Sequence, residues 1–403
     1  MANIRNVELA EIIKNYISLG FDEFRSNCYI LKDFHDEDER IRLSKGQVVD
    51  DMVIADITKF LEIEKNNNYK TDQVQTAILF ASRDNVFSSS KVWIESKKWD
   101  KKPRLWTIGE TVFGNTDSSI NRAIGIWIIN LVSGAYGFNT GEFQYTLDII
   151  GNQGTGKTEF LKRLGGQYYT DQMISFTKKD DFTIMASSLL VNDDEMQATF
   201  ELPAKNRDRI FKKFVSTNEF TYRAPYGRTN MTQKRHFVIA RTTNDSSYLT
   251  DLGGNRRVIP VIVNEQNIQN HSFELPDSWY ENVLAEARQC LGFNEIDDSS
   301  NLKEYYKELR DYDFTDLTDS LSSSINIKDA VLNALKNKFN NVEKIQGTTF
   351  NEEVENILYQ DGYEIEKRGL RRKIEDVMRS QNYDVGVSIK LNGKSARGYR
   401  LQK

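Results

Sequence analysis

The sequence predicts an α/β core flanked by a helical N-terminal region and a C-terminal domain with a winged-helix pattern. Three observations support this organisation. The strand-like run 143–150 leads directly into a glycine-rich loop and then a helix. From 143 to about 263, short β-like runs alternate with loops and helices, as in α/β folds. Beyond about residue 326, three helical segments precede a basic hairpin.

Composition sets the limits of this prediction. The 403 residues are 39% hydrophobic and 28% charged, which suits two or three folded domains. No run of about 18 apolar residues occurs, and the N-terminus lacks a signal-peptide pattern. We therefore expect a cytoplasmic protein without membrane contact. The two cysteines, Cys28 and Cys290, and three scattered histidines give no metal-ligand spacing or disulfide framework.

Boundaries follow from shifts in composition. We expect a helical N-terminal region at 1–66, a candidate oligomerisation collar, and a helical segment at 67–140. The core would span 141–295, a polar linker 296–325, and the winged-helix domain 326–403. Residues 366–403 hold eleven Lys and Arg against four Asp and Glu, a net charge of +7. Because the whole chain carries -5, the remainder carries -12, so a basic module is joined to an acidic body.

The most specific motif has the spacing Gly-x-x-x-x-Gly-Lys-Thr. It comprises Gly151, Asn152, Gln153, Gly154, Thr155, Gly156, Lys157 and Thr158. Glycines let the backbone wrap so that its N–H groups face phosphate oxygens, and the following helix adds its positive end. Lys157 would contact the β- and γ-phosphates and Thr158 would bind magnesium, so the sequence predicts ATP and Mg²⁺ as ligands. A chance match in a glycine-rich turn would not require the flanking strand and helix.

An acidic run follows the short apolar strand 188–191. We favour Asp193 and Asp194 as the acids that hold magnesium and polarise the attacking water, with Glu195 as the rival. An acidic helix N-terminus would show the same residues. Asn244, at the end of another strand, is a candidate partner of the γ-phosphate or the attacking water. Arg256 and Arg257 are candidate arginine fingers, and surface salt bridges are the alternative.

In this order, the motifs resemble superfamily three helicases and, more specifically, the virulence-associated protein E family, over about residues 69–265. The Trp93–Leu105 segment is similar to the family's tryptophan–aspartate segment, although Lys101 stands where the family usually has Gly. Residues 222–228 are similar to its Arg-x-Pro-Tyr-Gly-Arg element, and 242–244 and 254–257 match two further motifs. The family's acidic strand commonly ends in Glu, where this chain has Asn192.

The resemblance implies an AAA+-like P-loop ATPase core in a hexameric ring that threads DNA through its centre. It also implies a replication protein of a phage, satellite or genomic island, with phage or host replication proteins as partners. Many relatives carry a primase-polymerase domain. We expect none here, because the residues before the similar region show no acidic triad.

Cations interleaved with aromatic residues predict the DNA contacts. Between the acidic run and Asn244 these are Lys213, Arg223, Tyr226 and Arg228, near Lys212, Tyr222, Lys234 and Arg235. Such a cluster suits single-stranded DNA in a channel, and a solvated loop is the alternative. In the C-terminal domain the candidates are Arg371, Arg372, Lys373, Lys394, Arg397 and Arg400, around the hairpin signal Asn392-Gly393. They suit duplex origin DNA, and a protein-docking winged helix is the alternative.

Together these features predict an ATP-dependent replicative helicase and initiator of a mobile element. A DNA-binding ATPase switch or loader that remodels partners without unwinding is the main alternative. A small-molecule kinase is a third, which the paired arginines after Asn244 and the basic C-terminal tail disfavour.

Overall fold

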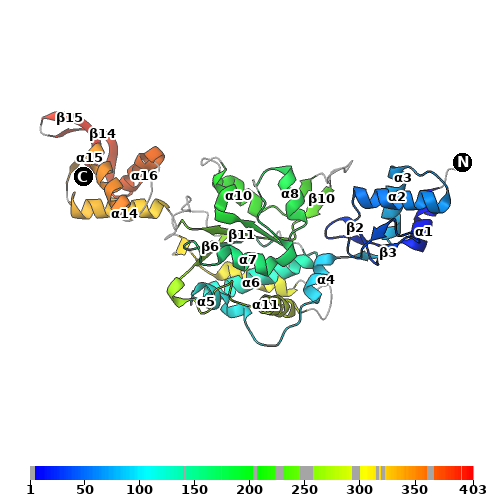
Figure 1. Ribbon diagram of the computed structural model, residues 1–403. Helices are drawn as coiled ribbons and strands as arrows, with labels where there is room; N and C mark the ends of the chain where they lie inside the picture. Colours follow the sequence, from blue (N-terminus) through cyan, green and yellow to red (C-terminus); the bar gives the residue numbers. More distant parts are fainter. Residues whose placement is uncertain are drawn as a thin grey trace.

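A computed structural model describes most of the chain. The described residues are 5–138, 142–173, 175–202, 207–222, 231–245, 257–292, 300–314, 317–318, 323–340, 342–360, 367–391 and 393–402. They form an N-terminal unit, a central unit and a C-terminal unit, which follow one another along the molecule (Figure 1). Each unit has a hydrophobic core of its own.

A five-stranded parallel sheet organises the central unit. Its strands lie in the order β12-β6-β11-β8-β7. They are β6 (Thr146–Ile150), β7 (Tyr169–Thr170), β8 (Leu190–Asp193), β11 (Val238–Thr243) and β12 (Val258–Ile262). In the register, Thr243 lies beside Ile150, and Arg241 lies beside Asp193. The carboxyl ends of β6, β11 and β8 are therefore neighbours at one edge, which confirms the predicted α/β class.

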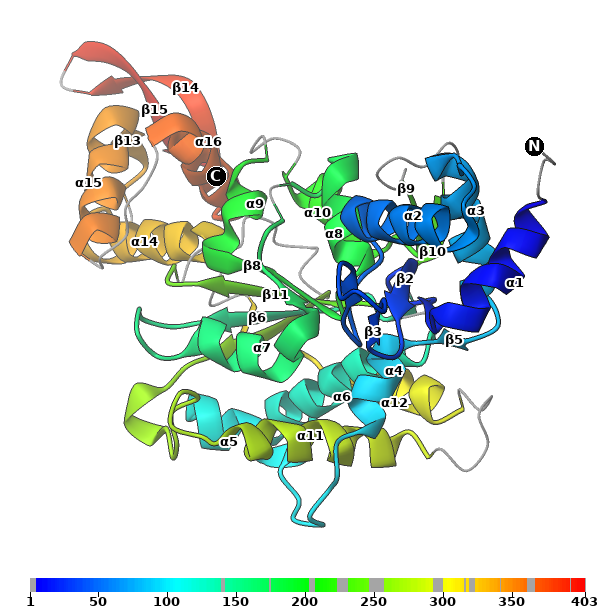
Figure 2. The ribbon, with the colours of Figure 1, turned by 45° about the vertical axis from the view of Figure 1, so that its right-hand side comes forward.

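Helices cover both faces of this sheet (Figure 2). One face packs on α4 (Ser89–Glu95), α5 (Ile108–Phe113), α6 (Ser118–Ala135), α7 (Lys157–Gly165) and α11 (Asp277–Cys290), with short 3-10 turns at Leu105–Thr107, Gly166–Tyr168 and Glu265–Asn267. The other packs on α8 (Lys179–Ala186), α9 (Gln197–Phe200) and α10 (Arg207–Val215), beside the hairpin of β9 (Glu219–Tyr222) and β10 (Met231–Lys234). Among the described residues, no helix has both the length and the apolar character needed to cross a bilayer.

The N-terminal unit differs from the helical region that we expected. Its helices are α1 (Asn6–Tyr16), α2 (Asp51–Lys65) and α3 (Thr71–Ser82). Its strands are β1 (Leu19–Asp22), β2 (Asn27–Ile30), β3 (Phe34–His35), β4 (Arg42–Leu43) and β5 (Val86–Phe87). Because β5 pairs with β1, the unit extends past residue 66. Strands of two to four residues are too short to show a period of two, so the expectation of a helical region at 1–66 is wrong for these segments.

The predicted linker 296–325 contains a helix of the central unit. This is α12 (Ser300–Asp311), whose residues Leu302, Tyr306 and Leu309 are buried in the main core. The Tyr306 hydroxyl donates a hydrogen bond to Asn130 Oδ1 on α6. Apolar residues at this spacing mark one helix face, a signal that the polar composition of the segment obscured.

The C-terminal unit has its own small core of residues between Ile327 and Tyr399. In chain order it contains α14 (Ser323–Asn337), β13 (Lys344–Gln346), α15 (Gly347–Gln360), α16 (Lys367–Ser380), β14 (Tyr383–Leu391) and β15 (Lys394–Leu401). The strands form an antiparallel sheet in the order β13-β15-β14.

Candidate functional site

The glycine-rich loop joins the buried strand β6 to α7. Gly154 and Gly156 have φ angles of 84° and 85°, in the left-handed region that favours glycine. Gly156 is the N-cap of α7, so the loop ends where the helix presents its free N–H groups. The Thr155 hydroxyl donates to the carbonyl of Asn152 across the turn, at 3.0 Å. The backbone thus has the local geometry that an anion site requires.

Lys157 is the first residue of α7, and its side chain extends back into the loop, so that only 6% of the residue's surface is exposed. Its ammonium donates hydrogen bonds to the carbonyls of Gly151 (2.6 Å) and Asn152 (2.8 Å), and to Asn244 Oδ1 (2.8 Å). Burial lowers the pKa of Lys157, while nearby carboxylates, Glu195 first, oppose that shift. A phosphate group here would supply the negative charge that a buried ammonium lacks.

Asp194 is the acid that meets the loop. Its Oδ1 accepts hydrogen bonds from the hydroxyls of Thr158 (2.6 Å) and Thr242 (2.9 Å), and from Asn192 Nδ2 (3.3 Å). Asn192 also donates to the Tyr169 hydroxyl, at 3.1 Å. In this chain, the position where the family often has Glu therefore carries an amide that helps to fix Asp194.

Glu195 and Asn244 form the outer edge of the site. Asn244 Nδ2 donates to both carboxylate oxygens of Glu195, at 3.1 and 3.3 Å, while its Oδ1 accepts from Lys157. Glu195 and Met196 both have left-handed φ angles, 52° and 51°. Each such angle costs a non-glycine residue about 1–2 kcal/mol, so two in succession mark a strained turn. The turn directs the Glu195 side chain toward Asn244.

Asp193, which we predicted to hold magnesium, faces away from the loop. It is 2% exposed, and its carboxylate accepts hydrogen bonds from the backbone N–H groups of Ala198 (2.8 Å) and Thr199 (3.0 Å). Burial raises the pKa of Asp193, although these bonds and Arg241 oppose the shift. Asp193 is the last residue of β8, whereas Asp194 begins the 3-10 turn Asp194–Met196, and of the two acids it is Asp194 that contacts Thr158. The prediction for Asp193 therefore loses its geometric basis, and its observed contacts stabilise the start of α9.

The remaining groups fit a magnesium–phosphate site. Mg²⁺ usually keeps several waters and takes one or two carboxylates together with substrate phosphates. The Thr158 hydroxyl and the Asp194 carboxylate, in contact beside the loop, supply such a set. No group of three or more His, Cys, Asp or Glu side chains suited to a metal occurs in the part of the chain that the structure describes. This donor set therefore suits a metal that binds together with a nucleotide.

Only one of the two predicted arginine fingers, Arg257, is among the described residues. Arg256 lies outside the described residues. Arg257 precedes β12, and its carbonyl accepts a hydrogen bond from Thr146 at the first residue of β6. The loop follows the last residue of β6, about 13 Å away at the usual rise per strand residue. The backbone of Arg257 is therefore at the amino ends of the strands, whereas the glycine-rich loop of the same chain is at their carboxyl ends.

Comparison with known proteins places this geometry in a family. A sequence model of the virulence-associated protein E-like domain matches residues 94–312, more than half of the 403 residues. The chain belongs to the virulence-associated protein E-like family. No curated protein matches it. Two solved structures of the C-terminal region of NrS-1 are similar in fold. They have TM-scores of 0.45 and 0.43, 14% and 13% identity, and cover 98% and 99% of this chain and 99% and 100% of theirs.

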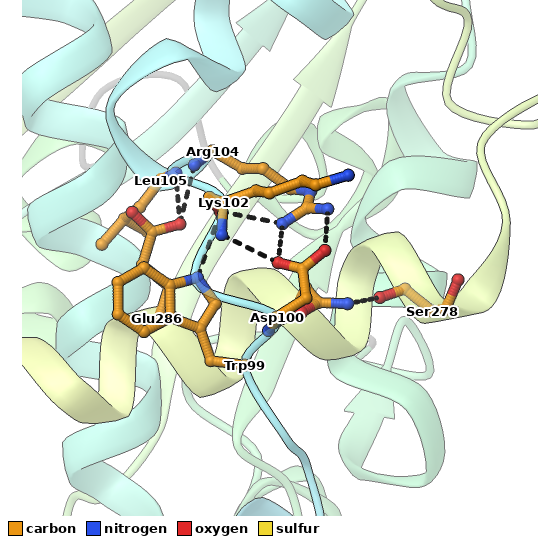
Figure 3. Close-up of polar contacts among 8 residues, drawn as sticks. Trp99, Asp100, Lys102, Arg104, Leu105, Ser278 and Glu286 are labelled. Atoms are coloured by element: carbon orange, nitrogen blue, oxygen red, sulfur yellow. Dashed lines mark hydrogen bonds and ion pairs between the residues drawn. The ribbon is translucent and has the colours of Figure 1, made fainter.

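The tryptophan–aspartate segment of this virulence-associated protein E-like chain forms a loop that is hydrogen-bonded to α11 (Figure 3). Asp100 forms an ion pair with Arg104 through both of its carboxylate oxygens, at 2.7 Å each, and its N–H donates to Asn282. The Trp99 indole donates to the carbonyl of Lys102, at 3.1 Å. Lys101, where the family usually has Gly, has a φ of 67°, which explains that preference for glycine.

A buried acid anchors the end of this loop. Glu286, on α11, is 4% exposed and accepts hydrogen bonds from the N–H groups of Arg104 (2.7 Å) and Leu105 (3.0 Å). These contacts join residues about 180 positions apart, and they fix the start of the family region onto the core.

The predicted channel residues are only partly within the structure. Arg223, Tyr226 and Arg228 lie outside the described residues, between β9 and β10, which pair as a hairpin. Lys213 is exposed on α10. Arg235 has a different role from the one predicted. It is 2% exposed and donates to the carbonyls of Val215 and Phe143, so it joins elements of the core and does not face solvent.

The predicted C-terminal cations lie on α16 and β15. Leu370, Ile374 and Met378 bury one face of α16, so its remaining faces carry the cations. Arg372, Lys394 and Arg397 are exposed, and Lys373 is half-buried. Arg371 and Arg400 are exposed as well but pair with acids of the same unit, Glu375 and Asp384, at 3.0 Å each.

Sequence reasoning assigned no role in the site to three residues that shape it. Asn192 and Thr242 orient Asp194, and the period of two along each strand could have identified both. Glu265 accepts a hydrogen bond from Asn152 Nδ2 at 2.8 Å, across 113 positions. No local pattern indicates that third contact.

Proposed function

We propose that this protein is an ATP-dependent DNA helicase and replication initiator of a mobile genetic element, built on an AAA+-like core of superfamily three type and acting in the cytoplasm. The observation that carries the proposal is the meeting of three strand ends at one edge of the sheet. Lys157 follows β6, Asp194 follows β8 and Asn244 follows β11, and hydrogen bonds connect each of them to the loop. Such a convergence of a cation, an acid and an amide suits phosphoryl transfer.

Each residue has a role in the proposed hydrolysis. The loop N–H groups and Lys157 would hold the β- and γ-phosphates, and Thr158 with Asp194 would hold Mg²⁺, directly or through water. Glu195, exposed and in contact with Asn244, would polarise the attacking water. The sequence left the catalytic acid open between Asp193, Asp194 and Glu195. The inward contacts of Asp193 favour the other two.

We propose further that ATP is hydrolysed between subunits of a ring, a hexamer by family resemblance. Arg256 and Arg257 would then act on the nucleotide of a neighbouring subunit. The position of Arg257 supports this, because its backbone lies beside the first residue of β6, about 13 Å along the strand from the loop of its own chain.

The proposed DNA contacts are of two kinds. Single-stranded DNA would run in the ring channel past Lys213 and the residues between β9 and β10, stacking on Tyr226. The C-terminal unit would bind duplex origin DNA as a winged helix, with α16 in the groove and the β14–β15 hairpin along phosphates. Its order of helix, strand, two helices and a hairpin supports this assignment. Phage or host replication proteins would complete the assembly.

Two assays on one preparation test the proposal. ATP turnover should rise when single-stranded DNA is added, and a forked duplex should be separated only in the presence of ATP and Mg²⁺. DNA-stimulated turnover without strand separation would favour the loader or switch. Absence of ATP turnover under all conditions would contradict both functions.

A further inference from the structure

The segment that follows β12 is fixed against the phosphate-binding loop. Ser272 is fully buried, and its hydroxyl donates to the carbonyl of Gly156 at 2.7 Å. Arg163, on α7, donates to the carbonyl of Ser272 at 2.9 Å. A Cβ on Gly156 would lie 2.2 Å from Ser272 Oγ, so this close approach requires glycine. With the bond between Asn152 and Glu265, the segment is held at both ends of the loop.

Beside Ser272, an aromatic side chain is left open to solvent. Phe273 is 53% exposed, although it lies against the loop: its Cδ1 is 3.4 Å from the position of a Cβ on Gly156. Its ring stacks on that of His271, with centroids 5.1 Å apart and planes 8° apart. One neighbour therefore orients the Phe273 ring, while much of its surface remains available for a further flat ring.

The strand order indicates on which side of β6 the γ-phosphate and the base of a bound nucleotide would lie. Asn244 and Asp194 follow β11 and β8, which lie on one side of β6. The segment 264–275 follows β12, which lies on the other side of β6. A nucleotide whose γ-phosphate meets Asn244 and Asp194 would therefore extend its base across the loop toward Phe273.

We infer that Phe273, backed by His271, is the platform on which the purine base of the bound nucleotide stacks. This inference rests on the proposed ATPase function and adds to it a binding group outside the phosphate motif. Stacking is tolerant of base identity, because every base has a π face. The platform therefore strengthens binding of the nucleoside part and leaves the choice between purines to other groups.

Comparing a ligand that has a base with one that has only phosphates distinguishes the contribution of the base to affinity from that of the phosphates. MgATP and magnesium tripolyphosphate are titrated into the full chain, Phe273→Ala, Phe273→Trp and Phe80→Ala. Phe80 is also an exposed phenylalanine, 43% exposed, and lies on α3 of the N-terminal unit. Phe273→Ala should weaken ATP binding about tenfold or more and leave tripolyphosphate binding unchanged. Phe273→Trp and Phe80→Ala should bind ATP as the unaltered protein does.

Two outcomes would overturn the inference alone. ATP affinity that is unchanged in Phe273→Ala would show that the ring does not contact the base. An equal loss for ATP and tripolyphosphate would show that the residue only supports the loop. If the unaltered protein binds neither ligand, the proposed function fails together with this inference, and that result is distinct from the other two.

Discussion

The central and C-terminal units would both hold phosphate groups, but they are built for it in opposite ways. The central unit uses one lysine that is 6% exposed, surrounded by protein oxygens at 2.6–2.8 Å, within a loop fixed by long-range contacts. The C-terminal unit would use exposed side chains around a small core, and two of the predicted DNA-binding cations, Arg371 and Arg400, already pair with acids of the unit.

This difference determines how each site should respond to change. If the proposed ATP site is correct, the central unit depends on a single buried group, which the surrounding protein would shield from salt. In the proposed duplex-binding C-terminal unit each exposed cation would contribute little, many contacts would add up, and salt would weaken them together. The same ligand group can thus be held by pre-organised geometry or by the sum of exposed charges.

The largest effect should come from Lys157→Ala. We expect ATP turnover to fall about 100- to 1,000-fold, because a pre-organised charge is lost where negative charge develops. Duplex DNA binding by the C-terminal unit should be unchanged. The reciprocal variant, Arg372→Ala, should weaken DNA binding and keep basal turnover. ATP turnover and duplex DNA affinity are measured for both variants. Loss of both properties in either variant would contradict the assignment of the two functions to separate units.

The next largest difference should be in the salt dependence of the two affinities, for duplex DNA and for MgATP. The logarithm of duplex affinity should fall linearly with the logarithm of salt concentration, and replacing Arg372, Lys394 and Arg397 by Ala should reduce that slope by about three. MgATP affinity should change much less over the same range. Replacing Lys32, Lys45 and Lys59 of the N-terminal unit provides the charge-matched control. A slope that is the same in both triple variants would contradict DNA binding by these cations.

The adjacent carboxylates Asp193 and Asp194 provide a matched pair of variants with smaller expected effects. Asp194→Asn should lower magnesium-dependent turnover about 10- to 100-fold, because Thr158 loses its anionic neighbour. Asp193→Asn should lower the free energy of unfolding by about 1–2 kcal/mol, because it weakens the cap on α9. Both variants are measured by turnover and by denaturant unfolding. The opposite assignment of effects would restore Asp193 as the metal-binding acid.

The last comparison concerns stability alone, at the loop around Trp99 that packs on α11. Glu286→Ala would leave the buried N–H groups of Arg104 and Leu105 without their acceptor, which should cost about 1–3 kcal/mol of stability. Glu281→Ala, on the same helix, removes only a surface ion pair with Lys97 and should cost less than about 1 kcal/mol. Denaturant unfolding compares the two variants. Equal losses would mean that Glu286 does not anchor this segment.

The sequence predicted features that a short stretch of chain determines completely. The glycine-rich loop is one, because eight consecutive residues and their flanks specify it. The choice between Asp193 and Asp194 was not such a feature, because it depends on where β8 ends and the 3-10 turn Asp194–Met196 begins. Contacts such as Asn152 with Glu265, or Ser272 with Gly156, depend on how distant segments pack. The base platform at Phe273 was therefore beyond prediction.

Titration calorimetry with MgATP tests the central claim most directly. The account predicts that each chain binds one nucleotide, that excess EDTA weakens this binding, and that Lys157→Ala nearly abolishes it. Equal affinity in the unaltered protein and in Lys157→Ala, with or without magnesium, would contradict the assignment of 151–158 as the nucleotide site.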